Sequence, residues 1–268
     1  MEQGRPLSGK RILITRPAEQ APGLAALLEA QGAAVVTLST IRIEPLGDIS
    51  ALDRAIQQRA CYHWIIFTSV NGVQAMQVRL DAAGLDWQAF KGAKLAAIGP
   101  ATAEALCRAG AQPDFVPSEY IAEAIAAGIG EVAGQRILLP RADIAREALA
   151  VELRKRGAEV DEMAAYRTVT RSLDAEAVRA ALAERLDVIT FTSSSTVRGF
   201  LAGLGEQKPD KVLRGVVVAC IGPITAQTAR AFGLAPQIVA GEYTMPGLVR
   251  AIVAYFTASE SRTTAAPL

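Results

Sequence analysis

Short apolar runs alternate with Ala-rich segments along most of the chain. The runs are rich in β-branched residues and bounded by Gly, Pro or Ser, as buried strands are, whereas the Ala-rich segments have the apolar spacing of helices. The βαβα order predicts an α/β fold whose parallel sheets are flanked by helices. The expected strands cover residues 11–15, 34–38, 64–68, 94–98, 136–139, 187–192 and 216–221.

This pattern occurs twice, about 125 residues apart. Residues 13–35 match residues 138–160, and in this alignment Arg16 corresponds to Arg141. An internal duplication predicts two similar lobes, and a cleft between lobes is a common place for a ligand. Two further motifs return in the same order: Phe67-Thr68-Ser69 as Phe191-Thr192-Ser193, and Ile98-Gly99-Pro100-Ala101-Thr102 as Ile221-Gly222-Pro223-Ile224-Thr225.

Two segments in matching places of the repeats are too long for ordinary strands. Residues 37–46 and 159–170 both look extended, although a typical strand has about five or six residues. We therefore expect each to run from one lobe into the other, as a two-stranded hinge. Residues 257–268 are small and polar without a pattern, and we expect a flexible tail there.

The composition excludes several classes of protein. Lys and Arg together number 28 and Asp and Glu 27, so the chain has no global basic field of the kind that nucleic-acid binding needs. The apolar runs are too short to cross a bilayer, and the first ten residues lack the apolar stretch of a signal peptide. We expect a cytoplasmic protein that binds neither nucleic acid nor membrane.

Metal sites and catalytic triads have little support in this sequence. The three cysteines are far apart among apolar residues, as buried free thiols are, and the single histidine, His63, precedes an expected strand. No cysteine has a second cysteine or a histidine close by in the sequence. We expect no metal, and neither Ser-His-Asp nor Cys-His chemistry.

Polar residues gather where the expected strands end and helices begin. Ligands of parallel sheets bind beyond these strand ends, and helix N-termini attract carboxylates. Such residues have a second explanation, because they can serve only to cap the helix, and a duplication can preserve a good turn without any ligand. The candidates for substrate binding are Thr68, Ser69, Asn71, Gly99, Thr102, Ser193, Ser194, Gly222, Pro223 and Thr225.

Arg16 and Arg141 are the charged candidates, since each follows the first strand of a repeat. A guanidinium can hold a carboxylate by two hydrogen bonds, although a surface arginine is often only solvated. The two Gly-Pro turns match neither a P-loop nor a GxGxxG motif, so nucleotide binding is weakly supported.

In their order and spacing, these motifs resemble the uroporphyrinogen-III synthase family over nearly the whole chain. The resemblance implies two α/β lobes joined by a two-stranded ladder, one contiguous lobe and one built from both chain ends. It assigns residues 1–38 and 172–256 to the first lobe, 45–166 to the second, and 39–44 and 167–171 to the hinge. Contiguous halves at residues 1–130 and 135–256 remain the alternative. The motifs are LITRP at 13–17, FTSVNGV at 67–73, IGPATA at 98–103, AYRTV at 165–169 and IGPITA at 221–226.

The resemblance also implies a reaction. Enzymes of this family, which are hydro-lyases, convert hydroxymethylbilane to uroporphyrinogen III without a cofactor, losing water and inverting ring D through a spiro intermediate. Tyr166 matches the tyrosine proposed to help the hydroxyl depart, and the alternative is an aromatic ring packed in the hinge. Thr102, Thr225, Ser69, Asn71 and Ser193 match binding positions. We expect a monomer that binds a tetrapyrrole and receives it from hydroxymethylbilane synthase.

A protein of another class would fit the same fold. Two-lobed proteins that clamp a small anion do no chemistry, and fold alone does not separate them from an enzyme. They usually carry an export signal, which is not recognisable at the start of this sequence.

Overall fold

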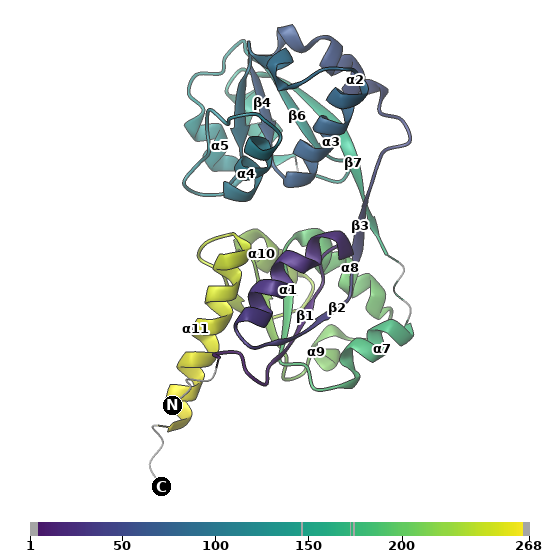
Figure 1. Cartoon of the computed structure of the whole chain (residues 1–268), viewed down its shortest axis with the longest axis vertical. Coiled ribbons are helices and arrows are strands. Elements are labelled where there is room, and N and C mark those ends of the chain that lie inside the picture. Colours follow the sequence, from purple (N-terminus) through teal and green to yellow (C-terminus); the bar gives the residue numbers. More distant parts are fainter. Residues whose placement is uncertain (1–4, 146, 172, 174, 265–268) are drawn as a thin grey trace. The chain divides into compact units, whose positions relative to one another are not determined.

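The computed structural model describes residues 5–145, 147–171, 173 and 175–264. Contacts divide the chain into two units (Figure 1). Unit 1 consists of Met1–Arg42 and Val169–Leu268, and unit 2 of Ile43–Thr168. The expected lobe boundary at residue 172 and the last four residues of the expected tail lie outside the described residues.

Unit 1 contains a five-stranded sheet in the order β10-β9-β8-β1-β2, and every neighbouring pair is parallel. Its sheet face with Ile12 and Ile14 packs under α1 and α11, and the face with Leu13 packs under α7, α8 and α10. The strands are β1 (Arg11–Ile14), β2 (Ala34–Thr37), β8 (Val188–Phe191), β9 (Val217–Cys220) and β10 (Pro236–Val239). The helices are α1 (Ala21–Ala30), α7 (Ala175–Ala183), α8 (Ser194–Leu204), α9 (Pro209–Val212), α10 (Pro223–Ala231) and α11 (Met245–Thr264), with a 3-10 turn at Ala18–Gln20.

Unit 2 contains the sheet β3-β7-β6-β4-β5, in which β7, β6, β4 and β5 run parallel. The face with Ile65 and Phe67 packs under α2, α3 and α4, and the face with Ile66 packs under α5 and α6. The strands are β3 (Ile41–Glu44), β4 (Trp64–Phe67), β5 (Lys94–Ala97), β6 (Arg136–Ala142) and β7 (Glu159–Thr170). The helices are α2 (Ser50–Gln57), α3 (Val70–Ala82), α4 (Pro100–Arg108), α5 (Ala122–Gly128) and α6 (Ala148–Lys155), with 3-10 turns at Arg59–Cys61 and Trp87–Phe90.

The predicted α/β class is confirmed, with two mainly parallel sheets flanked by helices. The alternation of side chains along each strand explains both cores, because neighbouring residues such as Ile12 and Leu13 face opposite sides of the sheet. A strand buried on both faces therefore appears in the sequence as a continuous apolar run.

One of the two long strands is confirmed and the other is not. β7 is a single strand of 12 residues, whereas β2 ends at Thr37 and β3 begins only at Ile41. A buried hydroxyl holds the break between them: Thr40 Oγ1 lies within hydrogen-bond distance of the carbonyl oxygens of Thr15 (3.0 Å) and Thr196 (3.1 Å), which share its one proton. The apolar pattern of the sequence does not reveal this bend, because the bend is caused by hydrogen bonds to backbone groups that are distant in the sequence.

The end of the chain also differs from the expected tail. α11 continues to Thr264, so residues 257–264 are helical. Thr257 Oγ1 donates to the carbonyl oxygen of Val253 (3.0 Å), a bond within one helical turn. Ala, Glu and Arg in this stretch have good helix propensity, and a helix already anchored by packing extends through them at little cost.

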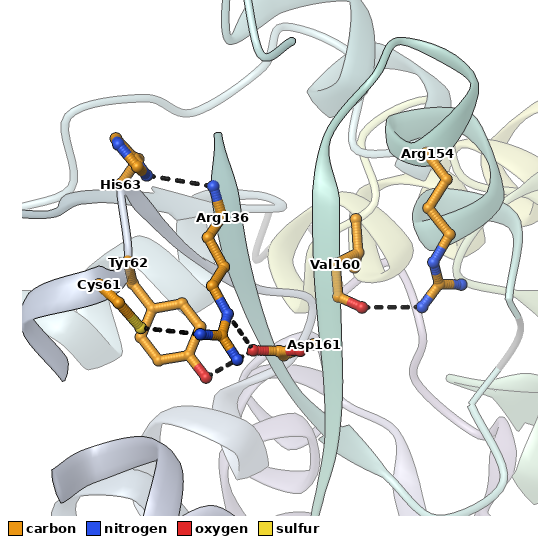
Figure 2. Close-up of polar contacts among 7 residues, drawn as sticks. All are labelled: Cys61, Tyr62, His63, Arg136, Arg154, Val160 and Asp161. Atoms are coloured by element: carbon orange, nitrogen blue, oxygen red, sulfur yellow. Dashed lines mark hydrogen bonds and ion pairs between the residues drawn. The ribbon is translucent and has the colours of Figure 1, made fainter. Parts of the chain in front are cut away.

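A polar cluster closes the amino end of the second sheet (Figure 2). Asp161 Oδ2 accepts from the Tyr62 hydroxyl (2.8 Å) and from Arg136 Nε (2.8 Å), and the guanidinium also lies over the Tyr62 ring. Burial and the carboxylate both raise the pKa of Tyr62. His63 Nδ1 accepts from the backbone N–H of Arg136 (3.1 Å), so the histidine binds the first residue of β6.

Candidate functional site

Tyr166 lies in β7 at an irregularity of the sheet. In the pairing of β6 with β7, Arg141 is opposite Ala164 but Ala142 is opposite Tyr166, so Ala165 is an extra residue, as in a β-bulge. Met163 and Ala165 pack on the face that α3 covers, and strict alternation would turn Tyr166 to the other face. The bulge instead brings Tyr166 to the α3 face as well.

The hydroxyl of Tyr166 meets the start of α3. Its Oη lies 3.0 Å from Ser69 Oγ, and the Asn71 side chain is a second hydrogen-bond partner. Ser69 is the N-cap of α3 and accepts from the N–H of Gly72 (3.1 Å). A Cβ at Gly72 would come within 2.9 Å of the Pro140 carbonyl oxygen, so only glycine allows this turn to approach β6 so closely.

The environment of Tyr166 keeps its phenol protonated. The side chain is only 8% exposed, and burial is the main cause that raises its pKa. The charge of Asp143 acts in the same direction, whereas Arg141 and the hydrogen bonds to Ser69 and Asn71 act against it. At neutral pH the group is therefore a hydrogen-bond donor and not a base.

A pocket of about 250 Å³ lies beside Tyr166 within unit 2. Asn71 and Gln74 line it from α3, and Glu44 lines it from β3. Its surface is mostly apolar, with the Tyr166 and Asn71 side chains among the few polar groups. This pocket was not anticipated from the sequence, because residues 43–49 and α3 meet only through the fold.

The two Gly-Pro turns have the same structure in both units. Gly99 and Gly222 are the N-caps of α4 and α10, with proline in the first helical turn and no side-chain cap. A Cβ on either glycine would lie 3.1 Å from a tyrosine ring, that of Tyr120 or Tyr243. The partial repeat of Glu-Tyr in the sequence is the signal that could have identified these two rings.

The threonines of these turns are more buried than a binding role suggests. Thr102 is 4% and Thr225 is 5% exposed, and both lie in the first turns of their helices. Pro223 occupies the first position of α10, where its fixed φ is favourable. Thr68, at the end of β4, is half-buried.

The turn at the start of α8 resembles that of α3, but among the described residues no tyrosine hydroxyl is bonded to it. Ser193 caps α8 by accepting from the Thr196 N–H (3.2 Å) within a capping box. Ser194 Oγ lies 2.7 Å from Thr228 Oγ1, which ties α8 to α10. The two helix starts therefore share a serine cap but differ in their other polar partners.

Arg16 follows β1 as the sequence indicates. Its Nη2 donates to Gln20 Oε1 (3.1 Å), Nη1 contacts the sulfur of Met245, and Nε is buried without a hydrogen-bond partner in the described structure. Both partners are uncharged, so they do not neutralise the guanidinium. Burial lowers the pKa of Arg16, which reflects the cost of keeping this charge away from water.

Arg141 corrects the interpretation drawn from the repeat. It does not follow its strand but lies within β6, is 7% exposed, and pairs with Glu162 of the neighbouring β7. Glu162 Oε1 also forms an ion pair with Arg154 Nη1 (2.9 Å). A guanidinium already paired with a carboxylate is less available to an acidic ligand, and the sequence could not show this pairing because 21 residues separate the partners.

In the described residues no group of three or more His, Cys, Asp or Glu side chains could hold a metal ion. Cys220 is buried, Cys61 is half-buried and Cys107 is exposed. No helix in the part of the chain that the structure describes is long and apolar enough to cross a membrane.

Comparisons with known proteins agree on one family. The family model for uroporphyrinogen-III synthase HemD matches residues 23–250. A uroporphyrinogen-III synthase of Synechococcus elongatus is 38% identical over 255 residues, which cover 92% of this chain and 96% of that protein. A porphyrin biosynthesis protein HemD of Ruminiclostridium josui is 32% identical over 91% of this chain and 48% of that protein.

Solved structures show the same fold. A crystal structure of a mutant uroporphyrinogen III synthase from Thermus thermophilus covers 94% of this chain and 99% of its own, with a TM-score of 0.66 and 19% identity. The enzyme from Helicobacter pylori has a TM-score of 0.57 at 17% identity over 92% of this chain and 99% of its own. From the family model and the sequence relatives together, the chain belongs to the uroporphyrinogen-III synthase family of porphyrin biosynthesis enzymes.

Proposed function

We propose that this chain is a hydro-lyase that cyclises hydroxymethylbilane to uroporphyrinogen III, with loss of water and inversion of ring D. The observation that carries the chemical step is Tyr166. Its hydroxyl is held by Ser69 and Asn71 at the edge of a pocket, and its pKa is raised.

The proposed role of Tyr166 follows from what the substrate already supplies. The electron-rich pyrrole expels the hydroxyl as the C–O bond breaks, both bonding electrons go to oxygen, and the methylene carbon that carried the hydroxyl becomes cationic, stabilised by the pyrrole nitrogen. A phenol donates a hydrogen bond to the departing oxygen without giving up its proton. That oxygen leaves as hydroxide and takes up the proton that the carbon closing the ring releases, so the sum is one molecule of water per cycle.

Arg16 is the proposed site for one of the substrate's carboxylates. Its charge is not neutralised by Gln20 or Met245, and a carboxylate reaching the buried Nε would supply the missing hydrogen bond. Gly99, Gly222 and the serines at the helix starts are proposed to contribute backbone N–H groups. Such groups bind carboxylates although they carry no net charge themselves. Arg141 is left out of this set, because Glu162 occupies its guanidinium.

Product analysis tests the activity. Incubation with freshly made hydroxymethylbilane should give the type III isomer, whereas spontaneous closure gives type I. If only type I forms while the bilane binds tightly, the chain is a binding protein and the proposal is wrong.

The Tyr166→Phe variant tests the mechanism. We expect it to fold normally and to close the ring more slowly by about 10²-fold, the lower end of what the loss of one oriented hydrogen-bond donor to a developing negative oxygen costs. Tyr62→Phe is the matched control, because it removes another buried hydroxyl at the opposite end of the same sheet. Equal rates for Tyr166→Phe and the parent protein would remove Tyr166 from the mechanism.

A further inference from the structure

One carboxylate holds the part of β7 that follows the bulge. Asp143 comes directly after β6, and its backbone N–H donates to the carbonyl oxygen of Tyr166 (3.1 Å). Its Oδ1 accepts from the N–H of Thr168 (3.1 Å), and its Oδ2 lies 3.3 Å from Arg167 Nε. A single residue is therefore bonded to three consecutive residues of β7.

These bonds lie where β6 stops pairing with β7, while β3 is the neighbour of β7 on its other edge. The last residue pair between β6 and β7 joins Ala142 to Tyr166, whereas β7 continues to Thr170. A bulge leaves one residue unpaired and bends its strand, so the direction of the next side chain depends on what holds the strand afterwards. The Asp143 carboxylate accepts from Thr168 as a strand carbonyl would, and it extends the ladder by one bond beyond the end of β6.

The orientation of Tyr166 is sensitive to this support. The hydroxyl stands at the far end of a long side chain, and it must meet both Ser69 and Asn71 on α3. A small rotation of the backbone at Tyr166 displaces its hydroxyl much more than its Cα. The negative charge of Asp143 also opposes loss of the phenol proton, while Arg141 favours it; Glu44 and Arg79 are the other charged side chains at the pocket.

We propose that Asp143 is a positioning residue for Tyr166, because its carboxylate fixes β7 after the bulge and so aims the phenol at Ser69 and Asn71. The placement of Tyr166 stands on geometry alone, whereas its consequence for ring closure rests on the proposed function.

The placement is tested by NMR of protein labelled at tyrosine. The chain has only five tyrosines, and the Tyr166 signal is the one that disappears in Tyr166→Phe. Asp143→Ala should shift the Tyr166 signal and leave the Tyr62 signal unchanged, since Tyr62 lies at the opposite end of the sheet. Asp143→Asn keeps the Oδ1 acceptor and should restore the parental signal. An unchanged Tyr166 signal in Asp143→Ala overturns the proposal.

The consequence for ring closure is tested by a double-mutant cycle. Asp143→Ala should reduce kcat by about tenfold with little change in KM, less than the 10²-fold that a misplacement of 1 Å can cost. In the Tyr166→Phe background the same substitution should have no further effect, because its target is gone. An equal loss of kcat in both backgrounds means that Asp143 acts through general structure, and this overturns the positioning role.

A matched control is Asp86→Ala, which removes another exposed carboxylate of unit 2 that accepts from a backbone N–H, that of Gln88 (2.9 Å). It should leave the Tyr166 signal and kcat unchanged. If Tyr166→Phe itself closes the ring at the parental rate, the proposed chemical role of Tyr166 is wrong, while the NMR signal still decides whether Asp143 positions it.

Discussion

Ser69→Ala offers a quantitative test of the site, because the duplicated chain contains its own reference. Ser69 and Ser193 occupy matching places and cap α3 and α8 through bonds of 3.1 and 3.2 Å to backbone N–H groups. In the part of the chain that the structure describes, Ser69 alone of the two also meets a tyrosine hydroxyl, that of Tyr166, at 3.0 Å. The two substitutions therefore remove the same cap, and one of them removes a second hydrogen bond.

The expected magnitudes follow from these bonds. Loss of a serine cap lowers the free energy of unfolding by about 1 kcal/mol. Loss of the bond to the buried Tyr166 hydroxyl adds about 1 kcal/mol. Ser193→Ala should thus cost about 1 kcal/mol and Ser69→Ala about 2 kcal/mol.

Urea unfolding measures this difference. Both tryptophans, Trp64 and Trp87, belong to unit 2, so fluorescence follows the unit that contains Ser69, and circular dichroism follows the whole chain for Ser193. With an m-value of about 2 kcal/mol/M, a loss of 2 kcal/mol moves the midpoint by about 1 M.

The Tyr166→Phe background provides the decisive comparison. Without the phenol hydroxyl, Ser69→Ala should cost only the cap, about 1 kcal/mol. If Ser69→Ala costs the same in both backgrounds, the bond between Ser69 and Tyr166 contributes nothing and the described site is incorrect.

One substitution and one labelling reaction test the buried groups. Breaking a buried ion pair typically costs about 3–5 kcal/mol. Arg141→Ala should lower the free energy of unfolding by less than this, because Glu162 keeps a second partner, Arg154, at 2.9 Å. A larger loss in urea unfolding would contradict this expectation. Burial raises the pKa of Cys220 to about 12, so at pH 8 its thiol stays protonated and should resist iodoacetamide in the folded protein. Exposed Cys107 should react under the same conditions, and mass spectrometry of the labelled peptides distinguishes the two; labelling of Cys220 as fast as Cys107 would show that it is not buried.

Local patterns in the sequence predict much of this structure. The apolar runs predict the buried strands, such as residues 64–68 for β4, because a strand covered on both faces must be apolar throughout. The repeat predicts that two sheets have matching turns, and the Gly-Pro motifs predict how α4 and α10 begin. These features depend on residues close together in the chain, and so composition and spacing reveal them.

Features that depend on register and charge pairing between distant segments could not be predicted. Arg16 and Arg141 are equivalent in the sequence, yet Arg141 pairs with Glu162 of a neighbouring strand while the identified partners of Arg16 are uncharged. The aim of Tyr166 depends on one extra residue in the pairing of β6 and β7, and on a carboxylate at Asp143. The physical reason is that a shift of one residue in a strand pair reverses the face of every following side chain, and the sequence of either strand alone does not contain that register.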